Sequence, residues 1–93
     1  MPYSKEFTDA NGRTQSIRTV GGMVLVKGFW PTGEERGITF DAAEFRTASI
    51  DPEYGNLNLQ VGNEEPRVSF GASRVAFTLE DVLEAVAAAR SGS

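Results

Sequence analysis

The sequence predicts an α+β domain, in which an antiparallel sheet or partly open barrel of about five to seven strands packs against one C-terminal α-helix. Three observations predict it. Short segments of alternating apolar and polar residues recur along residues 3–70, and ten glycines and four prolines are spread among them as turn signals. From Thr78 the apolar period becomes helical. The 93 residues, 40% of them hydrophobic, suffice for a single domain over 1–93 with one core.

Residues 1–21 are expected to form an N-terminal edge hairpin. Tyr3, Lys5 and Phe7 alternate with polar neighbours, as in a half-buried strand. Residues 9–12, Asp-Ala-Asn-Gly, read as a turn because Asn and Gly tolerate positive φ. Residues 13–20 then form a second strand with Ile17 as its only firmly apolar point, which predicts a hairpin that is polar on both faces.

Residues 23–26 form a continuous apolar run, Met-Val-Leu-Val, after a Gly21-Gly22 turn or bulge. Such a run is typical of a central strand covered on both faces. This strand is expected to continue to Trp30 and to stop at the proline turn of residues 31–34.

Residues 36–40 are predicted to resume the sheet, with Ile38 and Phe40 pointing inward. Asp41 is placed to cap one helical turn over residues 41–45. A further strand over residues 46–50 then leads into the turn of residues 51–55, which contains Pro52 and Gly55.

The clearest hairpin joins residues 56–61 to residues 66–70, since both segments alternate without fault. A four-residue loop between them gives the pairs Val61–Pro66, Leu59–Val68 and Leu57–Phe70, all on one face. A slip of one residue would turn this apolar set outward, so burial fixes the register. Residues 71–77 are either a last short strand or a connector.

The C-terminal helix is predicted over residues 78–90, followed by a frayed tail at 91–93. Thr78 is the expected N-cap, and Asp81 can complete a capping box. The expected core face consists of Leu79, Val82, Leu83 and Val86. A small-residue surface is expected near the helix end, where a second helix could approach and form a homodimer, and its members are Ala85, Ala87, Ala88 and Ala89.

Histidine and cysteine are both absent. Their absence excludes Ser-His-Asp and Cys-His catalysis, thiolate chemistry, zinc fingers, haem ligation and iron–sulfur clusters. The carboxylates fall in predicted turns, where they are usually solvated, and no EF-hand spacing is present. We therefore expect no enzyme, no catalytic residue, no cofactor and no metal site.

The formal net charge of −4 argues against direct binding to nucleic acid or to an anionic membrane surface. No apolar stretch approaches the roughly 20 residues needed to cross a bilayer. No secretory signal pattern and no cysteine framework point to export, so a cytoplasmic location is expected. The expected partner is another protein or a peptide.

A partner-binding site is predicted at the end of the central strand. Trp30 ends this strand beside Pro31, and tryptophan is strongly enriched at binding hot spots. The predicted contact residues are Phe29, Trp30, Pro31 and Arg36. The alternative is that Trp30 closes one end of the core.

The order of predicted elements resembles a small bacterial pleckstrin-homology-like (PH-like) domain. The segments that carry the resemblance span about three quarters of the chain and are residues 22–26, 37–40, 55–59, 68–70 and 77–83. The resemblance implies a binding scaffold without catalysis. The basic phosphoinositide pocket of some PH domains has no counterpart in this sequence, so lipid binding is not implied.

The leading functional hypothesis is a non-enzymatic protein–protein interaction module, which binds through an exposed strand edge or through the loops around Trp30. One alternative is a phage-type small acidic inhibitor of a nucleic-acid-handling host complex. Another is an oligomeric structural or assembly protein. Salt-dependent binding favours the inhibitor, and a mass that changes with concentration favours the assembly protein.

Overall fold

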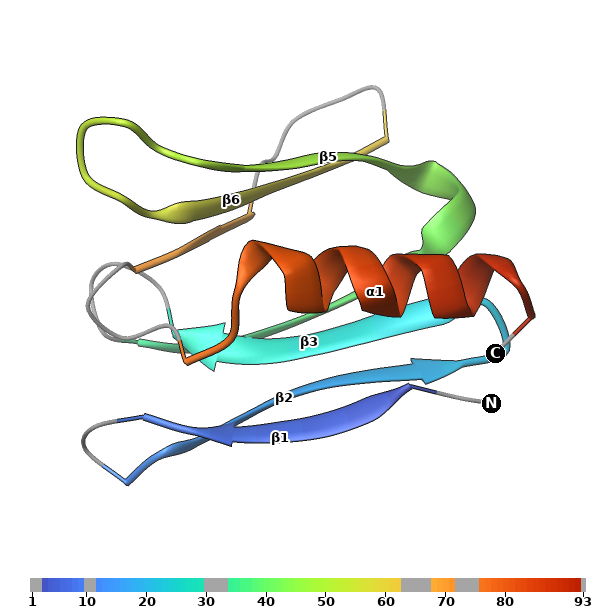
Figure 1. The fold of residues 1–93 in the computed structure, drawn as a ribbon, viewed down its shortest axis with the longest axis horizontal. Coiled ribbons are helices and arrows are strands. Elements are labelled where there is room, and N and C mark those ends of the chain that lie inside the picture. Colours follow the sequence, from blue (N-terminus) through green and yellow to red (C-terminus); the bar gives the residue numbers. More distant parts are fainter. Residues whose placement is uncertain (1–2, 10–11, 30–33, 63–67, 72–75, 93) are drawn as a thin grey trace.

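The computed structural model describes residues 3–9, 12–29, 34–62, 68–71 and 76–92. Within this part, strands arranged in two antiparallel sheets precede one C-terminal helix (Figure 1). The first sheet has the order β1-β2-β3-β4, and its strands are β1 (Ser4–Thr8), β2 (Thr14–Val20), β3 (Met23–Phe29) and β4 (Glu35–Asp41). The second has the order β5-β6-β7, and its strands are β5 (Phe45–Ile50), β6 (Leu57–Val61) and β7 (Val68–Phe70). The predicted fold class is therefore confirmed, as two open sheets.

The four-stranded sheet has one buried face. Ile17, Val24 and Val26 are at most 2% exposed, and each lies on the same side of its strand. The β2–β3 turn is formed by Gly21 and Gly22, which adopt φ values of 55° and 87° that favour glycine. β2 lies between β1 and β3, so only β1 of the first hairpin is an edge.

Two expectations for this sheet need correction. β2 carries polar residues on both faces, as predicted, but its inner face is buried in the core, where Gln15, Ile17 and Thr19 all lie. β3 is not covered on both faces, because Met23 and Leu25 are only half-buried. Their side chains lie on the outer face, which no described element covers.

The three-stranded sheet has the predicted β6–β7 register. Leu57 pairs with Phe70 and Leu59 with Val68, while the predicted Val61–Pro66 pair extends beyond the described residues. Leu57, Leu59 and Phe70 are at most 1% exposed, so burial of the apolar face fixes this register. A 3-10 turn, η1 (Ala42–Glu44), connects the two sheets, and the Asp41 side chain caps it by accepting from Ala43 N at 2.9 Å.

Helix α1 (Leu79–Arg90) begins at the predicted N-cap, Thr78, and has the predicted capping box. Of its predicted core face, Val82 and Val86 are buried and Leu79 packs against the core, whereas Leu83 is 44% exposed. Ala85 and Ala89 are buried in addition. Because Ala85 and Ala89 pack into the core, they cannot belong to the external small-residue surface on which the predicted helix-mediated homodimer depended.

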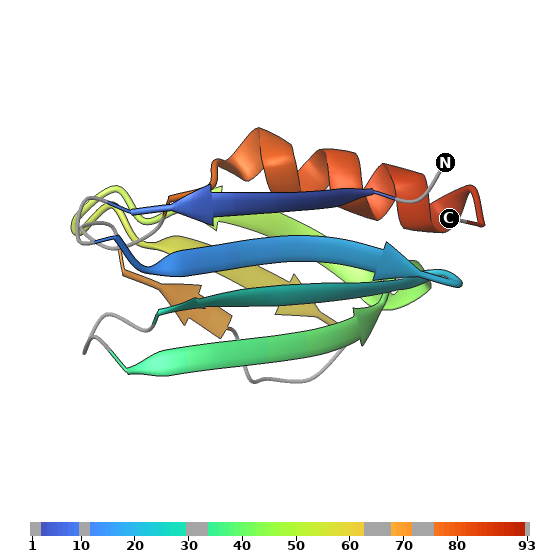
Figure 2. The ribbon, with the colours of Figure 1, turned by 90° about the horizontal axis from the view of Figure 1, so that it is seen from below.

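Figures 1 and 2 show how the layers are arranged. The four-stranded sheet forms one layer, and its inner face is covered by α1 on the β1–β2 side and by the three-stranded sheet on the β3–β4 side. The core lies between these layers. The opposite face of the four-stranded sheet, turned toward the viewer in Figure 2, is left open.

Candidate functional site

The predicted contact residues do not form one surface within the described chain. Trp30 and Pro31 lie outside the described residues. Phe29 is only 6% exposed, and the Arg13 guanidinium stacks on its ring at 4.1 Å. Arg36 is exposed on β4. In the β3–β4 register Phe29 pairs with Glu35 and Gly28 with Arg36, so Phe29 and Arg36 point to opposite faces of the sheet.

The outer edge of β4 is the clearest unsatisfied feature of the described chain. β4 has seven residues in continuous register with β3 and pairs with no other described strand. Natural edge strands are usually protected by shortness, bulges, lysine or proline. β4 has no bulge, lysine or proline; its charged residues, Glu35, Arg36 and Asp41, lie at its two ends, and residues 37–40 at its centre carry no charge.

The edges at β1 and β5 are protected. β1 has only five residues, one of which is a lysine. The β5–β6 register shifts between Phe45 and Thr47, which marks a bulge on β5. Among the edges at β1, β4 and β5, β4 is therefore the one best suited to pair with an added strand.

The hydrogen-bonding direction along β4 follows from one contact just beyond it. Ala42 N donates to Gly22 O at 3.0 Å. Because bonding alternates along an antiparallel pair, the even-numbered residues of β4 bond to β3. The N–H and C=O groups of Glu35, Gly37, Thr39 and Asp41 therefore point toward the open edge.

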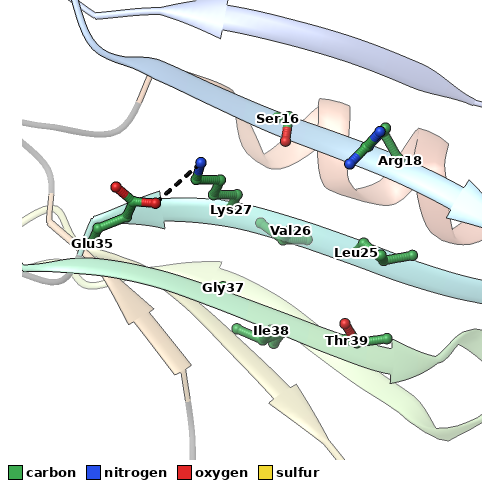
Figure 3. A pocket seen from close by; sticks show the side chains of 9 residues that line it. All are labelled: Ser16, Arg18, Leu25, Val26, Lys27, Glu35, Gly37, Ile38 and Thr39. Carbon is green, nitrogen blue, oxygen red and sulfur yellow. Dashed lines mark ion pairs between the residues drawn. The ribbon is translucent and has the colours of Figure 1, made fainter.

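A shallow hollow of about 240 Å³ lies on the open sheet face beside this edge (Figure 3). It lies over Gly37, where the absence of a side chain leaves space. Its walls include Leu25 and Thr39, while Lys27 and Glu35 form an ion pair at 3.1 Å along one side. Arg18 extends from β2 toward the hollow and is exposed.

Gly37 has no backbone or packing requirement for glycine. Its φ does not lie in the positive region that other residues avoid. A Cβ built on Gly37 would lie 3.8 Å from Val26 O, which is an ordinary van der Waals contact. By contrast, a Cβ on Gly28 would come within 2.8 Å of the Phe70 ring. Packing therefore requires glycine at position 28 but not at position 37.

A second, more apolar groove of about 690 Å³ adjoins the hollow and is lined in part by Tyr3, Val20 and Leu25. Val20 is 66% exposed there. Arg18 and Leu25 border both depressions. The outer face of β2 and β3 thus combines apolar side chains with a cation for which the described residues provide no ion-pair partner.

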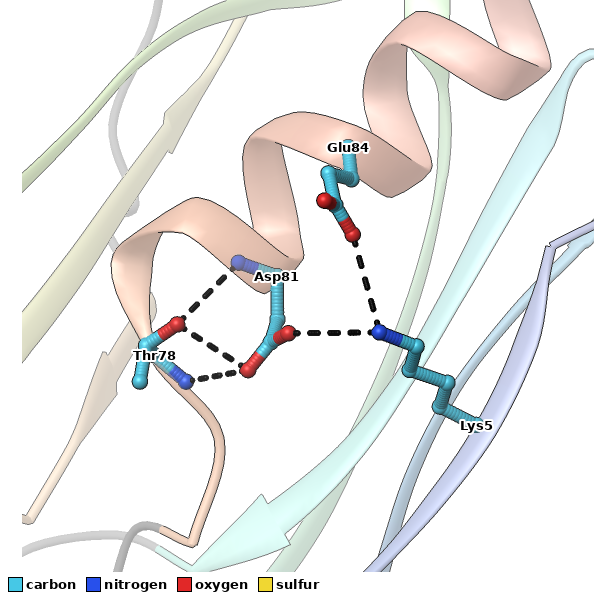
Figure 4. A network of polar contacts seen from close by, with 4 residues as sticks. All are labelled: Lys5, Thr78, Asp81 and Glu84. Carbon is cyan, nitrogen blue, oxygen red and sulfur yellow. Dashed lines mark hydrogen bonds and ion pairs between the residues drawn. The ribbon is translucent and has the colours of Figure 1, made fainter.

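A polar cluster ties β1 to the helix (Figure 4). Lys5 Nζ lies 3.9 Å from Asp81 and 3.7 Å from Glu84. Burial, and next the charge of Asp81, raise the pKa of Tyr3, whereas Lys5 partly lowers it. The charge of Tyr3 when ionised, and then that of Glu84, raise the pKa of Lys5. Lys5, Asp81 and Glu84 therefore form a surface ion-pair cluster, and this cluster does not enclose a cavity.

Several acidic side chains of the described chain have partners close to them in the sequence. Asp9 accepts from Arg13 N and Nε, at 2.9 and 3.0 Å. Asp51 accepts from Glu53 N in its own turn. Among the residues described, no three acidic side chains converge as a metal-binding group would require, and no helix is long and apolar enough to cross a membrane.

The site at β4 was missed from sequence, although one signal for it was present. Gly37 interrupts a strand that otherwise favours Ile, Thr and Phe, and an isolated strand glycine is a known sign of close approach by another group. Comparisons with protein-family models, curated proteins and solved structures give no match for this chain.

Proposed function

We propose that this chain is a non-enzymatic protein–protein interaction module that binds an extended segment of its partner as an additional strand along β4. The observation that carries this proposal is the regular outer edge of β4, which pairs with no other described strand and has the backbone groups of four residues directed outward. Strand addition uses such groups for affinity and alternate side chains for specificity.

The element order supports the resemblance to PH-like domains as part of this proposal. A four-stranded meander, a three-stranded meander and a C-terminal helix follow one another along the chain. A scaffold of this kind presents edges and loops for partners without requiring an active site. The predicted role of the loops around Trp30 remains compatible with a partner that continues past the end of β4.

No specific observation favours either alternative function. A phosphate-mimicking inhibitor needs free carboxylates gathered on one face, whereas Asp9, Glu35 and Asp81 are engaged with neighbouring cations. An assembly through the helix cannot use Ala85 and Ala89 as contact residues, because both are buried in the core. Both alternatives predict a response, to salt or to protein concentration, that strand addition does not require.

The test is a proline at an outward-directed position. Thr39→Pro removes an N–H that points to the open edge and leaves the β3–β4 hydrogen bonds intact. A partner isolated from the native host should bind the variant at least about tenfold more weakly, because one main-chain bond is lost and the proline ring blocks close approach. Amide exchange at Gly37 and Thr39 should slow when the partner binds the unaltered protein.

The matched control is Glu6→Pro on the open edge of β1. Thr19 N donates to Tyr3 O at 2.9 Å, so by the same alternation the Glu6 N–H also points outward. Glu6→Pro should leave partner binding unchanged. Equal binding by unaltered protein and Thr39→Pro, with both folded, would reject the proposed function.

A further inference from the structure

Gly37 is a glycine that the fold does not need. Neither its φ nor its surroundings exclude a side chain, and a Cβ there meets only Val26 O at 3.8 Å. Glycine inside a strand weakens the strand, because it adds backbone entropy to the unfolded chain and packs nothing. In this position a β-branched residue would fit and would stabilise the sheet.

The loss of strand stability caused by Gly37 is explained if a side chain of a bound partner occupies the space above this glycine. Its backbone N–H and C=O point to the open edge, so a strand added to β4 places one residue directly opposite Gly37. That residue's side chain lies on the outer face, beside the hollow between Leu25 and Thr39. Aromatic side chains commonly cover a glycine on the neighbouring strand in this way.

The charges around this position also select the occupant. Arg18, exposed at the far side of the hollow, offers a guanidinium to the face of an aromatic ring. The outward-facing ends of β4 carry Glu35 and Asp41, and the whole chain has a net charge of −4. Lys27, which lies directly opposite Gly37 on β3, already pairs with Glu35 at 3.1 Å, whereas the described residues provide no ion-pair partner for Asp41. These charges favour a partner segment with a basic residue opposite Asp41.

A second copy that pairs antiparallel through its own β4 leaves Gly37 uncovered, because the outward-facing residues of that strand are Glu35, Gly37, Thr39 and Asp41. When two β4 strands pair antiparallel about Ile38, Glu35 of each copy faces Asp41 of the other. Like charges directly opposite one another destabilise such a pair. In the same register Gly37 faces Thr39, so no aromatic side chain covers the glycine.

We propose, resting on strand addition at β4, that the bound partner segment carries a basic residue opposite Asp41 and an aromatic side chain opposite Gly37. This side chain lies across the glycine into the hollow and contacts Leu25 and Arg18. Gly37 is thus the specificity-determining residue of the edge.

The probe is a disulfide-closed β-hairpin peptide whose free strand reads Lys-Thr-Thr-Val-Tyr-Thr-Lys. Paired antiparallel with β4, it places its tyrosine opposite Gly37 and its lysines opposite Asp41 and Glu35. A second hairpin has alanine in place of the tyrosine. Both are titrated into the protein while the backbone amide resonances are followed by NMR, and the affinity is taken from the amides of Gly37 and Thr39.

The tyrosine hairpin should bind about tenfold more tightly than the alanine hairpin, from the cross-strand and cation–π contacts together. This preference should disappear in Gly37→Val and fall in Arg18→Gln. Gly37→Val should at the same time unfold at a higher denaturant concentration than the unaltered protein. Loss of preference in a more stable variant excludes misfolding as its cause.

Two other results have distinct meanings. If both hairpins shift the β4 amides with equal affinity, strand addition holds and the aromatic specificity is rejected. If neither hairpin shifts the β4 amides, or the shifts lie elsewhere on the molecule, strand addition at β4 is rejected together with the specificity.

Discussion

Gly28 lies on β3 where the Phe70 ring fills the space that a side chain would need. A Cβ at Gly28 would lie 2.8 and 2.9 Å from two ring atoms, and Phe70 is fully buried against Phe77. We expect Gly28→Ala to lower the free energy of unfolding by about 1–3 kcal/mol, as overpacking typically does. Urea denaturation measures it.

Gly37→Ala is the matched control for Gly28→Ala, because it adds the same methyl group to a neighbouring strand without a close contact. We expect it to leave stability unchanged or to raise it by up to about 1 kcal/mol. A loss of stability at Gly37 as large as that at Gly28 would contradict the packing argument for both positions.

Tyr3 and Lys5 make stability depend on alkaline pH. Both pKa values are raised in the folded chain, that of Tyr3 chiefly by burial and that of Lys5 chiefly by Tyr3. A group with a raised pKa stabilises the fold fully below its ordinary pKa, near 10.0 for Tyr3, and this stabilisation is lost as the pH rises through the folded-state value. Thermal unfolding should therefore show falling stability above pH about 10.

Tyr3→Phe tests this assignment. The Tyr3 hydroxyl is buried and has no hydrogen-bond partner among the residues described, so its removal should cost little at neutral pH. The variant should lose less stability than the unaltered protein when the pH is raised from about 9 to about 11. An identical alkaline loss in both proteins would assign the effect to other groups.

At the level of single elements, the N-terminus of α1 depends on reciprocal capping. Thr78 Oγ1 accepts from Asp81 N at 3.2 Å, and Asp81 accepts from Thr78 N at 2.8 Å. Thr78→Ala should lower the free energy of unfolding by about 1 kcal/mol, because Asp81 N loses its acceptor and the Asp81 carboxylate loses the hydroxyl that donates to it. Thr78→Ser retains the hydroxyl and should recover most of this loss in urea denaturation; equal losses in both variants would argue against the cap.

The sequence allowed the β6–β7 register to be predicted because each strand alternates strictly and only one register buries both apolar sets. The core face of α1 could not be predicted in the same way. Leu83 is more hydrophobic than Ala85, yet Ala85 is buried and Leu83 is exposed. Which residues of α1 face the sheets depends on how the helix is rotated against them, and this rotation is a property of the tertiary structure.

The candidate site shows the same limit. The apolar run of residues 23–26 predicted a strand buried on both faces. The sequence of this run does not show that the helix and the second sheet both cover the same face of the strand. Leu25 therefore remains half-buried beside the hollow. Trp30 was predicted as a binding residue because of its residue type. Gly37 differs from an ordinary structural glycine only in its φ and in the space around it, and neither can be known from the sequence.

Across the whole molecule, a few hydrogen bonds connect the two layers at opposite ends. At one end, Gly71 N donates to Phe29 O at 3.0 Å, and Ala76 N donates to the buried Gln15 side chain at 2.9 Å. At the other, Arg90 of α1 reaches the connection between the sheets. These contacts complement the apolar core, which by itself is non-directional, and they fix the helix relative to both sheets.

Arg90 is the contact through which this arrangement can be tested. Its Nε donates to Ala42 O and its Nη2 to Phe45 O, both at 3.1 Å, while its guanidinium lies 6.0 Å from the centre of the Phe45 ring. Arg90→Met keeps much of the aliphatic stem and removes both donors. Because two carbonyl groups then lose a charged donor at a partly exposed site, we expect the free energy of unfolding to fall by about 1–2 kcal/mol. Arg46→Met, on the exposed side of β5, should change it by less than about 0.5 kcal/mol. Equal effects of the two substitutions in urea denaturation would show that Arg90 does not hold the layers together.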